Sequence, residues 1–391
     1  MSEIKVNSIK GVGASAAAIT VNNTDGTCTA NITNNLSNRN LIINGAMNVA
    51  QRGTSSTSSG YHTVDRFDIN FSGTDEAPTQ AQVDVGSSDL PFTKGLTKAL
   101  KITNGNQTSG AGTADRIVIR HTIEAQDVRN SGWNYTSSSS SLTLSFYVRS
   151  SVAQNFFGQL RAFDGTEQIF PFETGSLSAN TWTKVTTPIA GNSNLTFDNN
   201  NDKGILIEWG MFRGTDGTNN SVTLNQWQAY SSTARTKDST STWYTTNDAT
   251  FEITGVQLEV GSVATDFEHR SYGDELLKCQ RYYEHSYNTG IAVGANSNNG
   301  GYYANLVSDP SNNAAWTLDY KVQKRAAPSL SFYADDGTAN QWDYNGSTVS
   351  AAKATVVGHR NSQTHLNAYL SIGASWTPCY VLGHWIASSE L

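Results

Sequence analysis

Six aromatic residues stand in short polar segments beside turn-forming residues, where a ring is hard to bury: Trp133, Tyr135, Trp243, Tyr244, Trp342 and Tyr344. A flat aromatic face packs well against the C–H groups of a sugar, and neighbouring Asn, Asp and Gln side chains can bond its hydroxyls. We therefore predict that these six residues are candidates for glycan binding. Packing between protein subunits would use the same side chains, and the sequence leaves that interpretation open.

Carboxylates suited to catalysis carry no informative spacing. Glycoside hydrolysis needs two carboxyl groups across a cleft, and the available glutamates are Glu208, Glu252, Glu259 and Glu268. We expect Glu259 and Glu268 to pair with Arg270. We likewise expect Asp65 to pair with Arg66 at the start of a strand. The sequence contains no GxSxG, HExxH or P-loop motif, so we expect a binding protein without catalytic residues.

Metal ligation is also weakly supported. Oxygen side chains alternate through residues 198–204 as in a calcium loop, but Lys203 occupies the glycine position and Trp209 stands where the bidentate glutamate belongs. An Asn-rich turn is the simpler prediction, with structural calcium left as a low-ranking alternative. His359, His365 and His384 share the last domain and could meet at a trimer axis, but their spacing is not that of a metal site. We therefore expect no metal site and no cofactor.

The elements that must position these side chains are strands. Only 15% of the 391 residues are charged, against about 25% in average soluble proteins, and Ser, Thr, Asn and Gly take their place. Apolar residues alternate with polar ones, as in Leu142, Leu144, Phe146 and Val148, or in Ile205, Ile207, Trp209 and Met211. Such period-two runs between turn clusters indicate half-buried strands. We expect Trp182 and Trp209 to belong to the core.

The composition also excludes several classes of protein. A net charge of −7 provides no basic stripe for nucleic acid. No apolar run is long enough to span a membrane, and the first residues lack the apolar region of a secretory signal. The three cysteines, Cys28, Cys279 and Cys379, are far apart and lack CxxC spacing, so we expect free, buried thiols made in a reducing cytoplasm.

Three parts of the chain differ in pattern. Residues 1–38 contain a few spread apolar residues and are predicted to form an extended attachment peg, with an ordinary flexible tail as the open alternative. Residues 39–272 are predicted to form a jelly-roll β-sandwich, and residues 273–391 a smaller C-terminal β domain. A short helix is expected over residues 274–283, with Ser271 as its N-cap and Asp274 at the capping-box spacing.

Several motifs together resemble one family. The run from Gly255 to Tyr283, GVQLEVGSVATDFEHRSYGDELLKCQRYY, is similar to the junction between the sandwich and the C-terminal domain in bacteriophage tail-fibre and receptor-binding proteins. LIINGAMNVAQRG at residues 41–53, VDRF at 64–67, WQAY at 227–230 and RAAP at 325–328 also resemble that family. SEIKVNS at residues 2–8 is similar to the start of fibre proteins in short-tailed phages of marine bacteria. The family usually has proline where this chain has Asp266.

The resemblance implies a jelly roll like those of carbohydrate-binding modules, a small β head and a homotrimer. We therefore predict a virion fibre subunit, assembled in the host cytoplasm, that binds a host surface polysaccharide and takes part in host adsorption. Its N-terminal segment would contact other virion structural proteins. Two alternatives stay open: an architectural head-fibre, decoration or spacer protein, and a glycan depolymerase. The sequence names neither the glycan nor the host, nor attachment to tail, neck or capsid.

Overall fold

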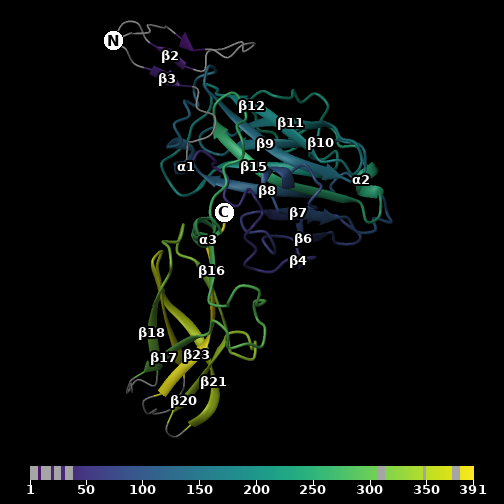
Figure 1. Ribbon diagram of the computed structural model, residues 1–391. Coiled ribbons are helices and arrows are strands. Elements are labelled where there is room, and N and C mark those ends of the chain that lie inside the picture. The colour runs from purple at the N-terminus through teal and green to yellow at the C-terminus, as the bar shows by residue number, and fades with distance from the viewer. Residues whose placement is uncertain are drawn as a thin grey trace.

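The chain is built almost entirely of antiparallel strands (Figure 1). The structure, a computed structural model, describes residues 8–9, 19–21, 28–30, 38–306, 313–346, 349–371 and 379–391. Most of the predicted N-terminal peg therefore lies outside the described residues. Its described parts pair as a small three-stranded sheet of β1 (Ser8–Ile9), β2 (Ile19–Val21) and β3 (Cys28–Ala30).

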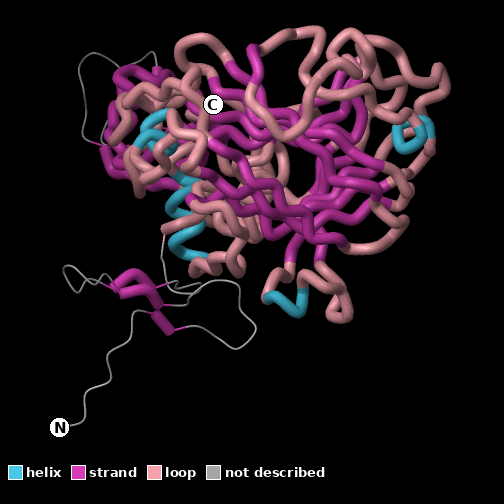
Figure 2. Tube along the Cα trace, turned by 90° about the horizontal axis from the view of Figure 1, so that it is seen from above, coloured by secondary structure: helices cyan, strands magenta, loops and turns pink. Residues whose placement is uncertain are grey.

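Two six-stranded sheets form a β-sandwich over residues 38–260 (Figure 2). Their orders are β14-β11-β10-β13-β8-β5 and β12-β9-β15-β7-β6-β4. The bounds of these strands are β4 (Ser55–Ser56), β5 (Asp68–Ser72), β6 (Thr79–Asp84), β7 (Lys98–Thr103), β8 (Arg116–Glu124), β9 (Ser141–Ser150), β10 (Asn155–Ala162), β11 (Gln168–Ser176), β12 (Thr183–Ala190), β13 (Lys203–Arg213), β14 (Gln228–Ala229) and β15 (Thr250–Val260).

The order of the strands is that of a jelly roll. One sheet contains the run β7-β15-β9-β12, and the other contains β8-β13-β10-β11. Along the chain, the pair β10-β11 is enclosed by the pair β9-β12, then by β8-β13 and then by β7-β15. Successive pairs alternate between the two sheets. This winding defines a jelly roll, so the predicted fold class is confirmed.

The core lies between the two sheets, where the predicted alternation places it. On β9, Leu142, Leu144, Phe146 and Val148 all face inward and are fully buried. Phe146 meets Trp209 of β13 edge-on, with ring centroids 5.8 Å apart. Burying each such side chain contributes about 1.5–3 kcal/mol, so these inward-facing residues stabilise the sandwich. Trp209 and Trp182 are both buried, as expected.

Short helices occupy connections between the strands: η1 (Phe92–Lys94), α1 (Ala125–Arg129), α2 (Thr242–Thr245) and α3 (Tyr272–Gln280). The predicted N-cap of α3 is confirmed, because the Ser271 hydroxyl accepts a hydrogen bond from the Asp274 N–H at 3.2 Å. The helix ends before Tyr283, which instead begins the strand β16 (Tyr283–His285). In the described part of the chain, every helix is too short and too polar to span a lipid bilayer.

The C-terminal β region, called the head below, comprises residues 283–391. Its path is β16-β23-β20-β21-β22-β18, with β17 and β19 also paired to β23. The remaining bounds are β17 (Tyr302–Leu306), β18 (Asn313–Asp319), β19 (Ser329–Tyr333), β20 (Gln341–Gly346), β21 (Val349–Asn361), β22 (His365–Ser371) and β23 (Cys379–Ser388). A separate apolar cluster that includes Trp316, Phe332, Trp342, Leu370 and Trp385 fills its interior.

Buried charges connect the sandwich to the head, and they show that the predicted pair of Asp65 with Arg66 is wrong. Asp65 lies 3.6 Å from Arg52, whereas Arg66 pairs with Glu390. Arg66 has a positive φ of 72°, and its buried guanidinium group also donates to the Thr122 carbonyl at 2.7 Å. The expected pair of Glu268 with Arg270 forms at 3.1 Å.

Glu259, in contrast, pairs with a residue of the first sandwich segment. Its carboxylate lies 3.4 Å from Arg39 and accepts the Thr265 N–H.

The thiol of Cys279 is free and buried at the base of α3, and burial raises its pKa. The side chains of Cys28 and Cys379 lie outside what the structure describes.

Candidate functional site

Four of the six predicted glycan-binding residues are buried, so the expectation that they are exposed is wrong. Trp243 and Tyr244 are 0% exposed. Helix α2 turns both rings into the sandwich, where the Trp243 indole N–H donates to the Thr250 carbonyl at 3.0 Å. Tyr244 stacks on Phe212 with centroids 4.4 Å apart. A polar loop can thus carry rings that fold back onto the core.

Trp133 and Trp342 are buried for the same reason. The indole N–H of Trp133 donates to the Ser140 carbonyl at 3.3 Å, beneath the serine-rich loop. Trp342 stacks on Trp316 with centroids 4.4 Å apart and donates to the His384 carbonyl at 2.8 Å. These partners satisfy each indole N–H, and neither ring can reach a ligand or a neighbouring subunit.

Tyr135 and Tyr344 are half-buried. Tyr135 packs edge-on against Phe197 of the sandwich core, with centroids 5.0 Å apart. Tyr344 packs against the core of the head and also borders a cavity on its surface. The structure therefore brings Tyr344 to the edge of this cavity.

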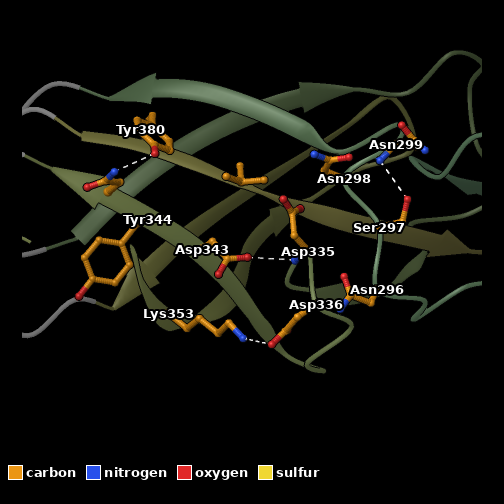
Figure 3. A pocket seen from close by; sticks show the side chains of 12 residues that line it. Asn296, Ser297, Asn298, Asn299, Asp335, Asp336, Asp343, Tyr344, Lys353 and Tyr380 are labelled. Carbon is orange, nitrogen blue, oxygen red and sulfur yellow. Dashed lines mark hydrogen bonds and ion pairs between the residues drawn. The ribbon is translucent and has the colours of Figure 1, made fainter. Parts of the chain in front are cut away.

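That cavity has a volume of about 730 Å³ and lies on the head (Figure 3). We refer to it as the head groove. Strands β20, β21 and β23 supply its floor, and two loops supply its rim. The lining residues share polar side chains, with two tyrosines and one leucine among them: Asn296, Ser297, Asn298, Asn299, Asp335, Asp336, Asp343, Tyr344, Asn345, Lys353, Tyr380 and Leu382.

Strand register explains which side chains line the floor. Asp343 of β20 lies opposite Leu382 of β23 and opposite Lys353 of β21. Asn345 lies opposite Tyr380. Because successive side chains point to opposite faces of a sheet, these residues share the outer face. The ring of Tyr344, between Asp343 and Asn345, turns to the other face, as its contact with the core shows.

Two tyrosines form an aromatic shelf beside the head groove. The rings of Tyr303 on β17 and Tyr380 on β23 are stacked, with centroids 5.2 Å apart at an angle of 29°. Tyr303 is 56% exposed. The Asn345 amide donates to the Tyr380 hydroxyl at 2.8 Å, and the Tyr303 hydroxyl donates to Asn305 at 3.0 Å. The rings are thus held in place while part of their surface faces solvent.

Three carboxylates occupy the other end of the groove. Lys353 pairs with Asp336, and this hydrogen bond holds the pKa of Asp336 well below its usual range. Asp343 accepts the Asp335 N–H at 2.9 Å. Burial, and then the neighbouring charge of Asp343, raise the pKa of Asp335. In Figure 3 the side chains of Asp335, Asp336 and Asp343 are neighbours across the groove.

The loop of residues 296–299 is anchored from below. The Ser297 N–H donates to the Asp335 carbonyl at 2.7 Å, and the Ser297 carbonyl lies 2.7 Å from the His384 imidazole. His384 is buried and stacks on Tyr287 with centroids 3.7 Å apart. The histidine therefore supports the loop, which can offer three asparagine amides to a ligand at low entropic cost.

The glutamates considered for catalysis form ion pairs with arginines. Glu208 lies 2.9 Å from Arg120 and also pairs with Arg213. Burial alone would raise the pKa of Glu208, but these two cations outweigh it and hold the pKa at about 2. Glu252 lies 2.7 Å from Arg149. A carboxyl group whose pKa is held as low as that of Glu208 cannot serve as a general acid.

The segment of residues 198–204 and the histidines of the last domain were the other positions considered for metal binding. The Asp202 N–H donates to the Asn200 side chain at 3.1 Å, so this segment forms the expected Asn-rich turn before β13. Among the residues that the structure describes, no group of three or more His, Cys, Asp or Glu side chains could hold a metal ion. The side chain of His359 lies outside the described residues.

Two smaller depressions offer fewer free groups. One of about 430 Å³ between sandwich and head contains Arg281 and Arg325. Arg281 is already bound to Glu124 at 2.7 Å, and Arg325 donates to three backbone carbonyls. The other, of about 270 Å³, lies on the sandwich beside Tyr147 and Lys184.

Comparison with known proteins gives distant structural similarities. No family model matches the sequence, and no curated protein matches it. Among solved structures, the chain is similar to the enzymatically active domain of tailspike protein 4 of bacteriophage CBA120, at 10% identity and a TM-score of 0.31, over 57% of this chain and 22% of that one.

Two carbohydrate-binding modules are also similar. The family 11 module of a cellulosomal cellulase from Clostridium thermocellum has 11% identity and a TM-score of 0.25, over 56% of this chain and 98% of that one. The N-terminal cellulose-binding domain of a Cellulomonas fimi β-1,4-glucanase has 10% identity and a TM-score of 0.26, over 55% and 99%. Values this low assign no function, which has to be inferred from the chain's own side chains.

Sequence reasoning missed Tyr303, Tyr380 and the loop of residues 296–299 as site residues. A signal was present, because Tyr303 alternates with Asn305, and Tyr380 with Leu382. Two residues that stand two positions apart share one face of a strand. Which face meets solvent depends on the partner strands, which the alternation does not identify.

Proposed function

We propose that this chain is a bacteriophage fibre subunit whose head binds a host surface glycan in the head groove. The observation that carries this proposal is the exposed shelf of Tyr303 and Tyr380 beside a cavity lined by amides and carboxylates. Stacked rings suit the C–H face of a sugar, and polar side chains suit its hydroxyls.

The position of the head supports an outward-facing role. In Figure 1, β2 and β3 lie at one end of the sandwich and the head at the other. An N-terminal segment that contacts other virion proteins would therefore leave the head groove free. Affinity per groove would be weak, and the proposed homotrimer, repeated over the particle, would multiply it. The resemblance in sequence to fibre proteins supports the virion part of the proposal.

A glycan array tests the binding part. Purified wild-type protein is expected to retain a defined set of bacterial polysaccharides. The Tyr380→Ala variant is expected to lose about tenfold in affinity, equivalent to about 1.4 kcal/mol, because it lacks the aromatic surface that a sugar would bury. Tyr272→Ala is the matched control, because Tyr272 is also exposed but lies on α3. Equal binding by all three proteins would refute the head groove as the site.

Phage adsorption separates the proposal from the architectural alternative. Particles that carry Tyr380→Ala should adsorb to host cells more slowly than particles that carry Tyr272→Ala. Normal adsorption by both would favour a decoration or spacer protein.

We further propose that the chain is no depolymerase. New reducing ends after incubation with the bound polysaccharide would overturn that part alone.

A further inference from the structure

The charges that line the head groove do not balance. Its lining contains the carboxylates of Asp335, Asp336 and Asp343 and the single ammonium group of Lys353. Lys353 is already paired with Asp336, and it also lies 3.3 Å from the hydroxyl of Thr338. Asp335 and Asp343 therefore have no cationic partner among the lining residues, and the groove carries a net negative charge.

These two uncompensated carboxylates are adjacent. Asp343 uses one carboxylate oxygen to accept the Asp335 N–H at 2.9 Å, which leaves the other oxygen without a hydrogen bond in the described part of the chain. Asp335 also has an oxygen without a hydrogen-bond partner. The environment already disfavours the charge on Asp335, as its raised pKa indicates. Burial is the main cause of this shift, and the neighbouring charge of Asp343 adds to it. A bound cation would offset the repulsion between the two carboxylates, whereas a bound anion would add to it.

The surrounding groups are suited to a sugar and not to a bare ion. The amides of Asn298 and Asn299 stand on the rim, and the stacked rings of Tyr303 and Tyr380 continue the surface beyond Asn345. A metal ion would need oxygen ligands on several sides and would make no use of the rings. A sugar that carries an ammonium group would use the rings, the amides and the carboxylates together.

We propose that the head groove selects its glycan by charge: it favours a sugar with a free amino group over the same sugar N-acetylated, and it rejects sugars that carry carboxylates. The inference rests on the proposed function, because it names the class of glycan that the same site takes. The selecting residues are Asp343 and Asp335, and the aromatic shelf contributes affinity without regard to charge.

The size of the preference follows from Coulomb's law. The attraction within an ion pair near a protein surface is large before solvation costs are counted. Exposure to solvent reduces it, whereas a hydrogen bond between the two charged groups strengthens it. We therefore expect a preference of roughly tenfold for the amino sugar over its N-acetyl counterpart, and a similar or larger penalty for an acidic sugar.

Three matched probes test this inference: β-1,4-linked tetramers of glucosamine, N-acetylglucosamine and glucuronic acid. Binding to the full chain is measured by NMR titration at about pH 6, where an ordinary aspartate is ionised, at low and at high ionic strength. Wild-type protein should bind the glucosamine tetramer about tenfold more tightly than the N-acetylated one, and the glucuronate tetramer least. Salt should reduce this preference, because ions screen exposed charges.

Asp343→Asn should bind the glucosamine and the N-acetylglucosamine tetramers with nearly equal affinity. Binding of the N-acetylated tetramer should persist. Asp84→Asn is the control, since Asp84 is an exposed aspartate of the sandwich, paired with Lys98 at 2.5 Å. If Asp343→Asn does not fold, Asp335→Asn and the salt dependence of the wild type give the same information.

Equal affinity of the wild type for all three tetramers, or tightest binding of the glucuronate tetramer, would overturn charge selection and leave glycan binding intact. If none of these tetramers binds while an array shows binding only to acidic glycans, charge selection is overturned as well. Failure to bind any glycan on the array would instead remove the proposed function, and the charge selection with it.

Discussion

The carboxylate of Glu390 accepts a hydrogen bond from the guanidinium group of Arg66, which precedes it by 324 residues. A second arginine, Arg52, lies 2.9 Å from the same carboxylate. The guanidinium groups of Arg66 and Arg52 also lie over the rings of Tyr282 and Tyr283, at 3.4 Å and 3.5 Å. The end of the head thus returns to the sandwich, so the head groove is presented on a firmly attached base.

Removal of this carboxylate should weaken the attachment. In Glu390→Gln, Arg66 stays buried with no anionic partner, a change that typically costs about 3–5 kcal/mol. We expect a lower midpoint of urea denaturation and faster hydrogen exchange in β16. Asp84→Asn, which breaks the exposed pair with Lys98, should cost less than about 1 kcal/mol. Equal effects of the two variants would contradict a structural role for Glu390.

Acid should destabilise the sandwich through Glu208. Its pKa is about 2 in the folded chain, below the ordinary value of 4.5, so the unfolded chain binds more protons between these two values. The stabilisation is therefore complete above about pH 4.5 and is lost as the pH falls towards 2. Urea denaturation between pH 3 and pH 6 should show this slope, and Glu208→Gln should reduce it. Glu76→Gln, at an exposed position, should leave the slope intact.

The burial of Trp342 can be tested against its original interpretation as a ligand-binding residue. Because the ring is 0% exposed in the head core, Trp342→Ala should lower stability by about 3–5 kcal/mol. Hydrogen exchange should increase in β17–β23 and remain slow in β7–β15. Trp243→Ala should instead increase hydrogen exchange in β7–β15 and leave it slow in β17–β23. Loss of glycan binding with unchanged exchange in the head would restore Trp342 as a contact residue.

Two glycines should respond in opposite directions to the same substitution. Gly255 has a φ of +61°, and a Cβ there would lie 2.5 Å from Leu96 Cδ1 and 3.0 Å from Tyr147 Cδ2. Gly255→Ala should therefore destabilise the chain by more than about 1 kcal/mol. Gly273 lies in α3 with nothing near its Cβ position, so Gly273→Ala should stabilise it by about 0.4–1 kcal/mol. Thermal denaturation of both variants decides the sign of each effect.

The strands and the cap of α3 followed from local pattern, whereas the jelly-roll class was predicted from the size of the strand-rich region and from the family resemblance. Alternation of apolar and polar residues has the period of a strand wherever the strand later packs, and Ser271 with Asp274 caps a helix through contacts within one turn. These features depend on neighbours in the sequence, so the sequence alone determined them. Trp209 illustrates this, because its apolar strand neighbours already indicated a buried face.

Exposure of the aromatic residues was decided only by the tertiary structure. Trp342 and Tyr380 both stand beside polar residues, yet Trp342 is buried against Trp316, while Tyr380 stacks on Tyr303 beside the groove. Alternation assigns two residues to the same or to opposite faces of one strand, but it does not state which face another layer covers. That choice depends on strand pairing and on loops from distant parts of the chain, as does the pairing of Glu390 with Arg66. The tertiary structure therefore moved the candidate site from buried tryptophans to a pair of stacked tyrosines.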